Sequence, residues 1–99
     1  MPVPIEAKSN GCTLAAVLLM PHGELVELNG SGFQPNGDLQ MESSSGKEHQ
    51  TQTVKAAQEG TWVSAILPYV KGARHGTTHV KAIDAKCSPE LSFEWGTPN

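Results

Sequence analysis

The sequence has few aromatic residues, no cluster of basic residues and no long apolar run, and each shortage excludes a class of protein. Aromatic residues make up 5 % and apolar residues 37 % of its 99 residues, enough for one small core and one domain, residues 1–99. The seven basic residues are scattered and the net charge is −3, so nucleic acid is not an expected partner. The seven-residue apolar run from Leu14 to Met20 is too short to span a membrane.

Only two cysteines are present, Cys12 and Cys87, and they lie near opposite ends of the chain. The absence of a C-x-x-C pattern argues against a zinc site or a thioredoxin-like motif. The two residues can form a disulfide, or they can be two buried thiols that pack as small apolar side chains. We predict the disulfide, because it would join the first strand of a small β domain to the last part of its sheet. In the loop-entropy model such a bond contributes about 4–5 kcal/mol.

The N-terminus shows no secretory signal, since Met1-Pro2-Val3-Pro4 lacks a basic region followed by an apolar stretch. We interpret the sequence as a domain taken from a longer secreted protein, with Met1 added for expression. Residues 1–11 are expected to be an extended or flexible segment. The expected location is extracellular, periplasmic or at the cell surface.

What the sequence does contain is a series of short alternating segments separated by turn residues at intervals of about 8–12, as in an antiparallel β-sandwich. The clearest turn is Gly30–Asp38, in which Phe33 is the one large apolar side chain and the expected core anchor. A short helix stays an alternative for the first segment because of Ala15 and Ala16. The seven predicted strands cover residues 12–20, 24–29, 38–43, 50–56, 61–67, 77–86 and 90–95, with a polar loop at 43–48.

Alternation also predicts which side chains point inward. Residues 50–56 are polar and are predicted to form an edge strand, whereas residues 91–95 are predicted to lie in the interior of a sheet. The expected core residues are Val26, Leu28, Phe33, Leu39, Met41, Trp62, Ile66, Val80, Ala82, Leu91 and Phe93.

Three motifs in this order resemble bacterial immunoglobulin-like domains of secreted and cell-surface proteins. They are Gly-Ser-Gly-Phe-x-Pro-x-Gly-Asp at 30–38, Gly-Thr-Trp at 60–62 and Gly-Thr-Thr-x-Val-x-Ala at 76–82. The resemblance covers Leu25 to Trp95 and implies an immunoglobulin-like sandwich of about seven strands. It also implies a spacer, adhesion or ligand-binding module without shared catalytic residues. The chain departs from the pattern by inserting Asn36 before Gly37 and by carrying two cysteines.

Four histidines, His22, His49, His75 and His79, are candidates for metal ligands. On a strand, His75 and His79 would share a face but lie about 13 Å apart, too far for one ion. No cysteine or carboxylate completes a ligand set at the usual spacing, so we predict solvated histidines and no metal or other cofactor.

Ser31, between two glycines, is the serine whose surroundings come nearest to those of a catalytic serine, but the sequence has no Gly-x-Ser-x-Gly motif. Glu24, Glu27, Asp38 and Glu42 alternate with apolar residues and are expected on a solvent-facing side. The pattern therefore predicts no catalytic residue.

The aromatic residues bear on carbohydrate binding. Trp62 and Trp95 follow the inward period of their strands and are expected in the core, whereas Tyr69, in a loop, is the aromatic expected to be exposed. We predict a non-catalytic structural or interaction module of a secreted or cell-envelope protein that presents loops or an edge strand. Its partner is a protein or carbohydrate, and edge pairing with a peptide or a second copy is expected. The alternative is a carbohydrate- or small-ligand-binding accessory domain of an extracellular enzyme.

Overall fold

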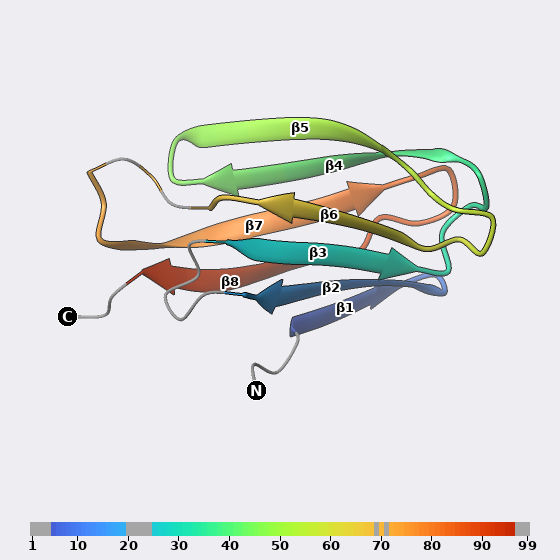
Figure 1. Cartoon of the computed structure of the whole chain (residues 1–99), viewed down its shortest axis with the longest axis horizontal. Helices are drawn as coiled ribbons and strands as arrows, with labels where there is room; N and C mark the ends of the chain where they lie inside the picture. Colours follow the sequence, from blue (N-terminus) through green and yellow to red (C-terminus); the bar gives the residue numbers. More distant parts are fainter. Residues whose placement is uncertain (1–4, 20–24, 69, 71, 97–99) are drawn as a thin grey trace.

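The computed structural model describes residues 5–19, 25–68, 70 and 72–96, which form eight β-strands (Figure 1). Within these ranges no helix is long and apolar enough to cross a membrane. The strands are β1 (Ile5–Ser9), β2 (Cys12–Leu18), β3 (Val26–Ser31), β4 (Asp38–Ser45), β5 (Glu48–Lys55), β6 (Trp62–Ile66), β7 (His75–Ile83) and β8 (Glu90–Gly96).

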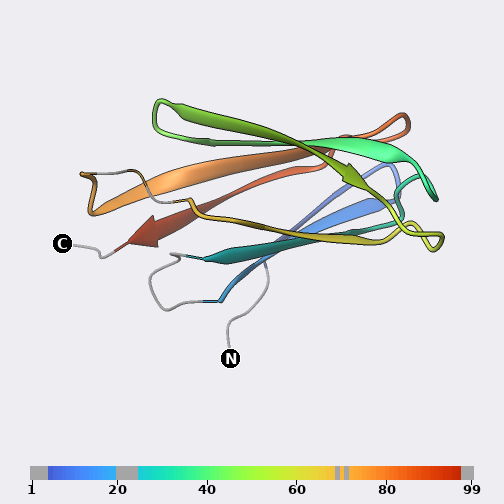
Figure 2. The ribbon, with the colours of Figure 1, turned by 45° about the horizontal axis from the view of Figure 1, so that its top comes forward.

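The strands form two four-stranded sheets in which all neighbours are antiparallel. One sheet has the order β1-β2-β3-β6 and the other has the order β5-β4-β7-β8. The two sheets lie as separate layers in Figure 2, with β5 next to β6 along one border and β1 next to β8 along the other. The chain therefore crosses between the layers after β3, after β5 and after β6.

The space between the sheets is filled by the side chains that alternation assigned to the inside. All eleven predicted core residues are buried, and Trp95 is buried with them. The core also contains residues that were not in the predicted set. These additional members are Cys12, Leu14, Ala16, Ala56 and Cys87.

Two glycines of the Gly-Ser-Gly corner are required for different reasons. Gly30 lies opposite Trp62 in the β3–β6 pair, and a Cβ on Gly30 would overlap the Trp62 indole and the Phe33 ring. Those two rings pack edge to face with centroids 5.6 Å apart. Gly32 has a φ of +77°, and a Cβ there would overlap the Gly11 carbonyl. The corner thus allows Phe33 to reach the core.

The strand count differs from the predicted seven because Ile5–Ser9 pairs with β2 as an additional strand. Ile5 and Ala7 pack partly against the core, so this part of the N-terminal segment is extended and paired. Residues 12–18 form a strand, not the alternative helix.

The predicted polar loop at 43–48 is wrong, because β4 continues to Ser45 and only Gly46 and Lys47 connect it to β5. The hydroxyl groups of Ser45 and Thr78 are buried and hydrogen-bonded at 2.6 Å. A polar residue can occupy an inward position when its hydrogen bond is satisfied there. Here the partner of Ser45 lies 33 residues further along the chain, so a local sequence pattern cannot reveal the hydrogen bond.

The predictions for the two sheet edges have different outcomes. β5 is at the edge of its sheet, as predicted for 50–56. β8 is at the opposite edge of the same sheet, so the prediction that 91–95 lie in the sheet interior is wrong. Alternation shows that one face of a strand is covered, but it carries no information on how many strands lie beside it.

Candidate functional site: the free edge and outer face of one sheet

The hairpin between β4 and β5 determines which backbone groups of β5 are free. Its two-residue connection has Gly46 at a φ of +59°, and Ser45 and Glu48 form the last pair before the turn. In such a hairpin the residues that flank the turn exchange both backbone hydrogen bonds, and the pattern then alternates. Ala56 continues it beyond the strand, since its N–H donates to the Gly37 carbonyl at 2.9 Å. The even-numbered residues of β5 therefore bond to β4, and the odd-numbered residues direct their N–H and C=O groups outward.

The side chains of β5 follow the same alternation. His49, Thr51, Thr53 and Lys55 lie on the outer face, the side of the sheet that points away from the other sheet. Thr53 accepts a hydrogen bond from Gln40 at 3.0 Å.

On the inner side, Gln52 accepts a hydrogen bond from Ser64 of β6 at 3.1 Å. This bond connects the borders of the two sheets. It also fixes the position of β5 without using any backbone group on its free edge.

A hollow of about 520 Å³ lies on the outer face of the same sheet, lined by residues of all four strands. We call it the polar hollow. The strand registers arrange its outward-facing side chains in two rows. One row is His49, Ser44, His79 and Ser92, and the other is Thr51, Glu42, Lys81 and Glu90.

The polar hollow contains two carboxylates, Glu42 and Glu90, and one ammonium group, Lys81. Lys81 is opposite Glu42 on one side and Glu90 on the other, so the ammonium group has a carboxylate neighbour on each flanking strand. The lining residues include hydroxyl groups and imidazoles but no aromatic ring other than the imidazoles. This chemistry suits a polar, uncharged ligand better than an anion or an apolar ligand.

The other predicted site residues are spread over the molecule. His75 and His79 are both exposed on β7, four residues apart on one face. Ser31 is exposed at the end of β3, and within the described residues its side chain has no hydrogen bond to a histidine or an acid. His22, Glu24 and Tyr69 lie outside the described residues.

Of the acids that are described, Asp38 and Glu42 are exposed on β4 and Glu27 is half-buried on β3. Both tryptophans are in the core, and the Nε1 atoms of Trp62 and Trp95 have no acceptor among the described residues. The tryptophans therefore do not form an exposed platform for a sugar ring.

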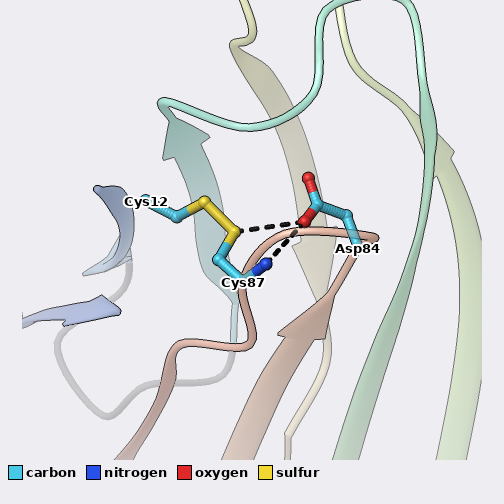
Figure 3. A group of neighbouring side chains, drawn as sticks. All are labelled: Cys12, Asp84 and Cys87. Carbon is cyan, nitrogen blue, oxygen red and sulfur yellow. Dashed lines mark hydrogen bonds between the residues drawn. A yellow bond between two sulfur atoms is a disulfide. The ribbon is translucent and has the colours of Figure 1, made fainter. Parts of the chain in front are cut away.

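Cys12 and Cys87 form a disulfide with a Cα–Cα distance of 6.2 Å, as predicted (Figure 3). It joins the start of β2 to the loop between β7 and β8, and hence one sheet to the other. Each sulfur also contacts an oxygen: Cys12 Sγ lies 3.3 Å from the Gly32 carbonyl, and Cys87 Sγ lies 3.2 Å from Asp84 Oδ1. Disulfide sulfurs carry no proton, so these contacts would become hydrogen bonds only after reduction.

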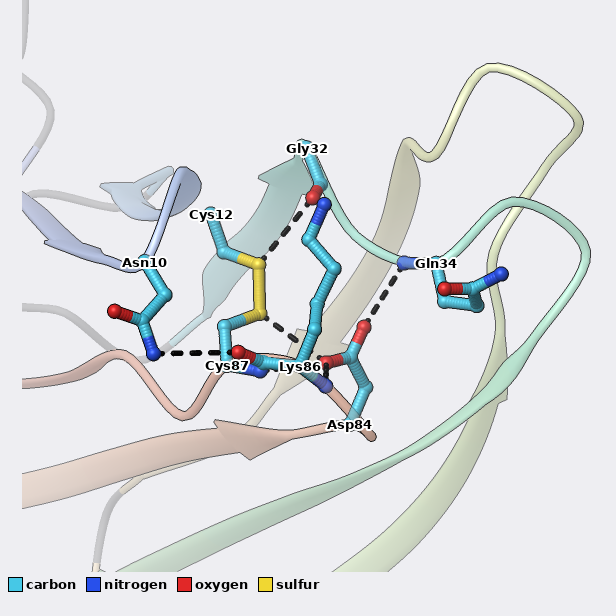
Figure 4. Close-up of a disulfide and its surroundings, with 7 residues drawn as sticks. All are labelled: Asn10, Cys12, Gly32, Gln34, Asp84, Lys86 and Cys87. Atoms are coloured by element: carbon cyan, nitrogen blue, oxygen red, sulfur yellow. Dashed lines mark hydrogen bonds between the residues drawn. A yellow bond between two sulfur atoms is a disulfide. The ribbon is translucent and has the colours of Figure 1, made fainter.

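Asp84 organises the loop around the disulfide (Figure 4). Its Oδ1 accepts hydrogen bonds from the backbone N–H groups of Lys86 and Cys87 at 2.8 and 2.9 Å, and its Oδ2 accepts one from Gln34 at 2.9 Å. Burial acts to raise the pKa of Asp84, but these hydrogen bonds and the nearby Lys86 charge lower it below the ordinary value of 3.8. The carboxylate thus holds together two loops at one end of the molecule.

Among the described residues, the cysteines and Asp84 are also the one group of three whose ligand atoms are close enough to hold a metal ion. The two sulfurs are joined to each other, and both Asp84 oxygens accept backbone hydrogen bonds. In this arrangement the disulfide and the Asp84 carboxylate hold the surrounding loops together.

Sequence reasoning did not find the polar hollow, and it did not single out Asp84. The rows of the hollow depend on the register between β4 and β7, which are far apart in the sequence. Asp84 did have a local signal, because an aspartate at the start of a tight turn commonly accepts hydrogen bonds from the backbone two or three residues later.

Comparisons of this chain with protein families, curated proteins and solved structures find no match.

Proposed function

We propose that this chain is a non-catalytic interaction module that binds an extended segment of a partner at the free edge of β5. In this mode of recognition, called β-augmentation, the partner adds a strand to an existing sheet through main-chain hydrogen bonds. The observation that carries the proposal is the outward direction of the backbone groups of His49, Thr51 and Thr53. Their side chains all lie on the outer face, so they leave the edge itself uncovered.

The architecture supports an immunoglobulin-like assignment as part of the same proposal. Without β1, the remaining strands form a three-stranded β2-β3-β6 sheet facing the four-stranded β5-β4-β7-β8 sheet. Immunoglobulin-like domains have two antiparallel sheets of this kind around one core, with strands exchanged between the layers. In this assignment β1 is an additional strand that extends the first sheet.

A secreted or cell-envelope location is proposed on the basis of the disulfide between Cys12 and Cys87. Disulfides persist in oxidising compartments and are rare where thiols are kept reduced. In such a compartment the bond persists. It adds stability to a domain whose small size and lean core give it little stability to spare.

The alternative function, a carbohydrate- or small-ligand-binding accessory domain, is favoured by the polar hollow. Its volume is about 520 Å³, and its walls offer hydroxyl, carboxylate, ammonium and imidazole groups to a polar ligand. The burial of both tryptophans weighs against stacking on a sugar ring.

The experiment that separates the two functions is NMR titration of the 15N-labelled domain. The probes are eight-residue peptides of alternating threonine and valine, and maltose. We expect the peptides to shift the amide signals of His49, Thr51 and Thr53. We also expect Thr51→Pro to abolish this effect and Lys81→Ala, in the hollow, to leave it unchanged. Shifts caused by maltose and centred on Ser44 and Lys81, with none caused by the peptides, would favour the alternative.

A further inference from the structure

The free edge of β5 has an uncharged middle and opposite charges at its two ends. Glu48 begins the strand, Lys55 ends it, and the residues between them carry no carboxylate or ammonium group. Proteins usually protect edge strands from pairing with charged residues, prolines or bulges. β5 has no proline, and its register with β4 is continuous over all eight residues, without a bulge. This edge therefore has none of those protections in its middle.

We propose that β5 pairs in antiparallel orientation with β5 of a second copy of this chain, joining the two sheets into one of eight strands. The inference rests on the proposed function, because it names the partner of the same edge. Two copies that meet at the same edge can pair antiparallel, related by a two-fold axis perpendicular to the sheet, or parallel, related by an axis along the strands. We infer the antiparallel pair, because parallel pairing is slightly less stable per residue and would put the outer face of one copy on the same side as the inner face of the other.

The direction of the side chains limits the register. A two-fold axis perpendicular to the sheet keeps both outer faces on one side, so odd-numbered residues must lie opposite odd-numbered residues. These are also the residues with free backbone groups. Two registers then give long overlaps: Thr51 opposite Thr51 of the second copy, or Thr51 opposite Thr53.

Charge and hydrogen bonding both select the second register. With Thr51 opposite itself, Lys55 would be opposite Lys47 of the second copy, and about six backbone hydrogen bonds would form. With Thr51 opposite Thr53, Lys55 is opposite His49, and all four outward-facing residues of the strand are paired. About eight backbone hydrogen bonds then form.

The side chains are compatible with this register. Each Thr51–Thr53 pair on the outer face is a favourable cross-strand combination. On the inner side, the two copies of Gln52 meet at the two-fold axis, and each is held in place by its hydrogen bond from Ser64. The polar hollows of both copies would lie on the same side of the joined sheet.

The other sheet edges are less suited to pairing with a copy of themselves. β8 has Glu90 and Glu94 on its outer face, and a two-fold pairing centred on Ser92 would place these acids opposite each other. β1 and β6 have five residues each, so they offer fewer backbone hydrogen bonds than the eight residues of β5. Among the described strands, β5 is therefore the best candidate for self-pairing.

Sedimentation velocity and NMR between about 10 μM and 1 mM test the proposal over the range of a weak interface. We expect a dimer to form with increasing concentration, with shifts at the amides of His49, Thr51 and Thr53. Thr51→Pro removes only an outward-pointing N–H, so the β4–β5 hydrogen bonds remain and the dimer is expected to weaken at least tenfold. Thr51→Val keeps that N–H and is the matched control, expected to dimerise as the wild type does.

A charge variant covers the case in which Thr51→Pro does not fold. Thr51→Lys combined with Thr53→Lys puts like charges opposite each other in both Thr51–Thr53 pairs and is expected to weaken the dimer severalfold, whereas Thr51→Lys combined with Thr53→Glu puts opposite charges there and is expected to keep it. A wild-type chain that stays monomeric at about 1 mM, or a dimer unaffected both by Thr51→Pro and by Thr51→Lys combined with Thr53→Lys, would overturn the inference. A monomeric chain whose β5 still binds the threonine–valine peptides would overturn this inference alone and leave the proposed function in place.

Discussion

At the scale of single residues, the packing of Phe33 shows how a corner in the chain can anchor a small core. The ring is 1 % exposed and meets the edge of Trp62 above Gly30. Replacing Phe33 with alanine should lower the free energy of unfolding by about 3–5 kcal/mol, because it empties a buried aromatic site. Urea denaturation measures the loss.

Val63 provides the control for this measurement, because it is also a large apolar residue but is 68 % exposed. Val63→Ala should change the free energy of unfolding by no more than about 0.5 kcal/mol. A loss below about 1 kcal/mol for Phe33→Ala would show that the ring does not anchor the core.

Asp84 gives the domain a pH-dependent contribution to stability. Because its pKa is lower in the folded state than the ordinary 3.8, the unfolded chain binds the proton more readily. The contribution is therefore fully present above the ordinary pKa and is lost as the pH falls through the lower, folded value. Asp84→Asn should cost roughly 1–2 kcal/mol at pH 7, the value of weakened backbone hydrogen bonds.

The measurement is urea denaturation of the wild type and of Asp84→Asn between about pH 7 and pH 2.5, a range that includes the ordinary pKa. The difference in stability should be constant above about pH 5 and should shrink below about pH 4. Comparing the free energies of unfolding of the two proteins at each pH cancels the effect that titration of the other carboxyl groups has on both. A difference that stays constant down to the lowest pH would contradict the role of the carboxylate.

At the scale of strands, the backbone directions in β5 lead to an alternating pattern of hydrogen exchange. The amides of His49, Thr51 and Thr53 point away from β4, whereas those of Gln50, Gln52 and Val54 donate to it. In a dilute sample, the odd-numbered amides should exchange at least tenfold faster than the even-numbered ones. Exchange read out by NMR tests this, and equal protection of both sets would mean that another strand already covers the edge.

The strands also show which parts of the fold the sequence could predict. Alternation such as Leu91, Phe93 and Trp95 depends on one buried face, so it predicted the strands and their inward residues. Sheet neighbours depend on long-range pairing, so β8 was misplaced in the sheet interior. Ser45 was assigned to a loop because its stabilising partner, Thr78, is distant in the sequence.

The candidate site was predictable only in part for the same reason. The polar, weakly charged composition of residues 50–56 identified the edge strand from local sequence. The polar hollow could not be predicted, since His49 and His79 come into one row only through the pairing of β4 with β5 and with β7. Sequence patterns report what a strand buries on each face, whereas a site on a sheet depends on which strands become neighbours.

At the scale of the whole molecule, the disulfide between Cys12 and Cys87 restricts the unfolded chain. The cysteines are 75 residues apart, so the loop-entropy model gives a contribution of about 4–5 kcal/mol. Replacing both cysteines with alanine should lower the free energy of unfolding by this order, as measured by urea denaturation without reductant. A wild-type protein whose mass is unchanged by reduction, or a loss below about 1 kcal/mol in the variant, would contradict this role.

The same bond has a mechanical consequence for a domain that is pulled along its chain. Tension applied to the two ends would pass from Cys12 to Cys87 through the covalent bond, and the intervening chain would carry no load. Because the cysteines are separated by 75 positions in the sequence, about 250 Å of contour length stays hidden even if the sheets come apart. In optical tweezers the oxidised domain should therefore lengthen by about 250 Å less than the reduced one. The disulfide therefore sets an upper limit on how far the domain can lengthen under tension, since only the segments outside residues 12–87 can extend.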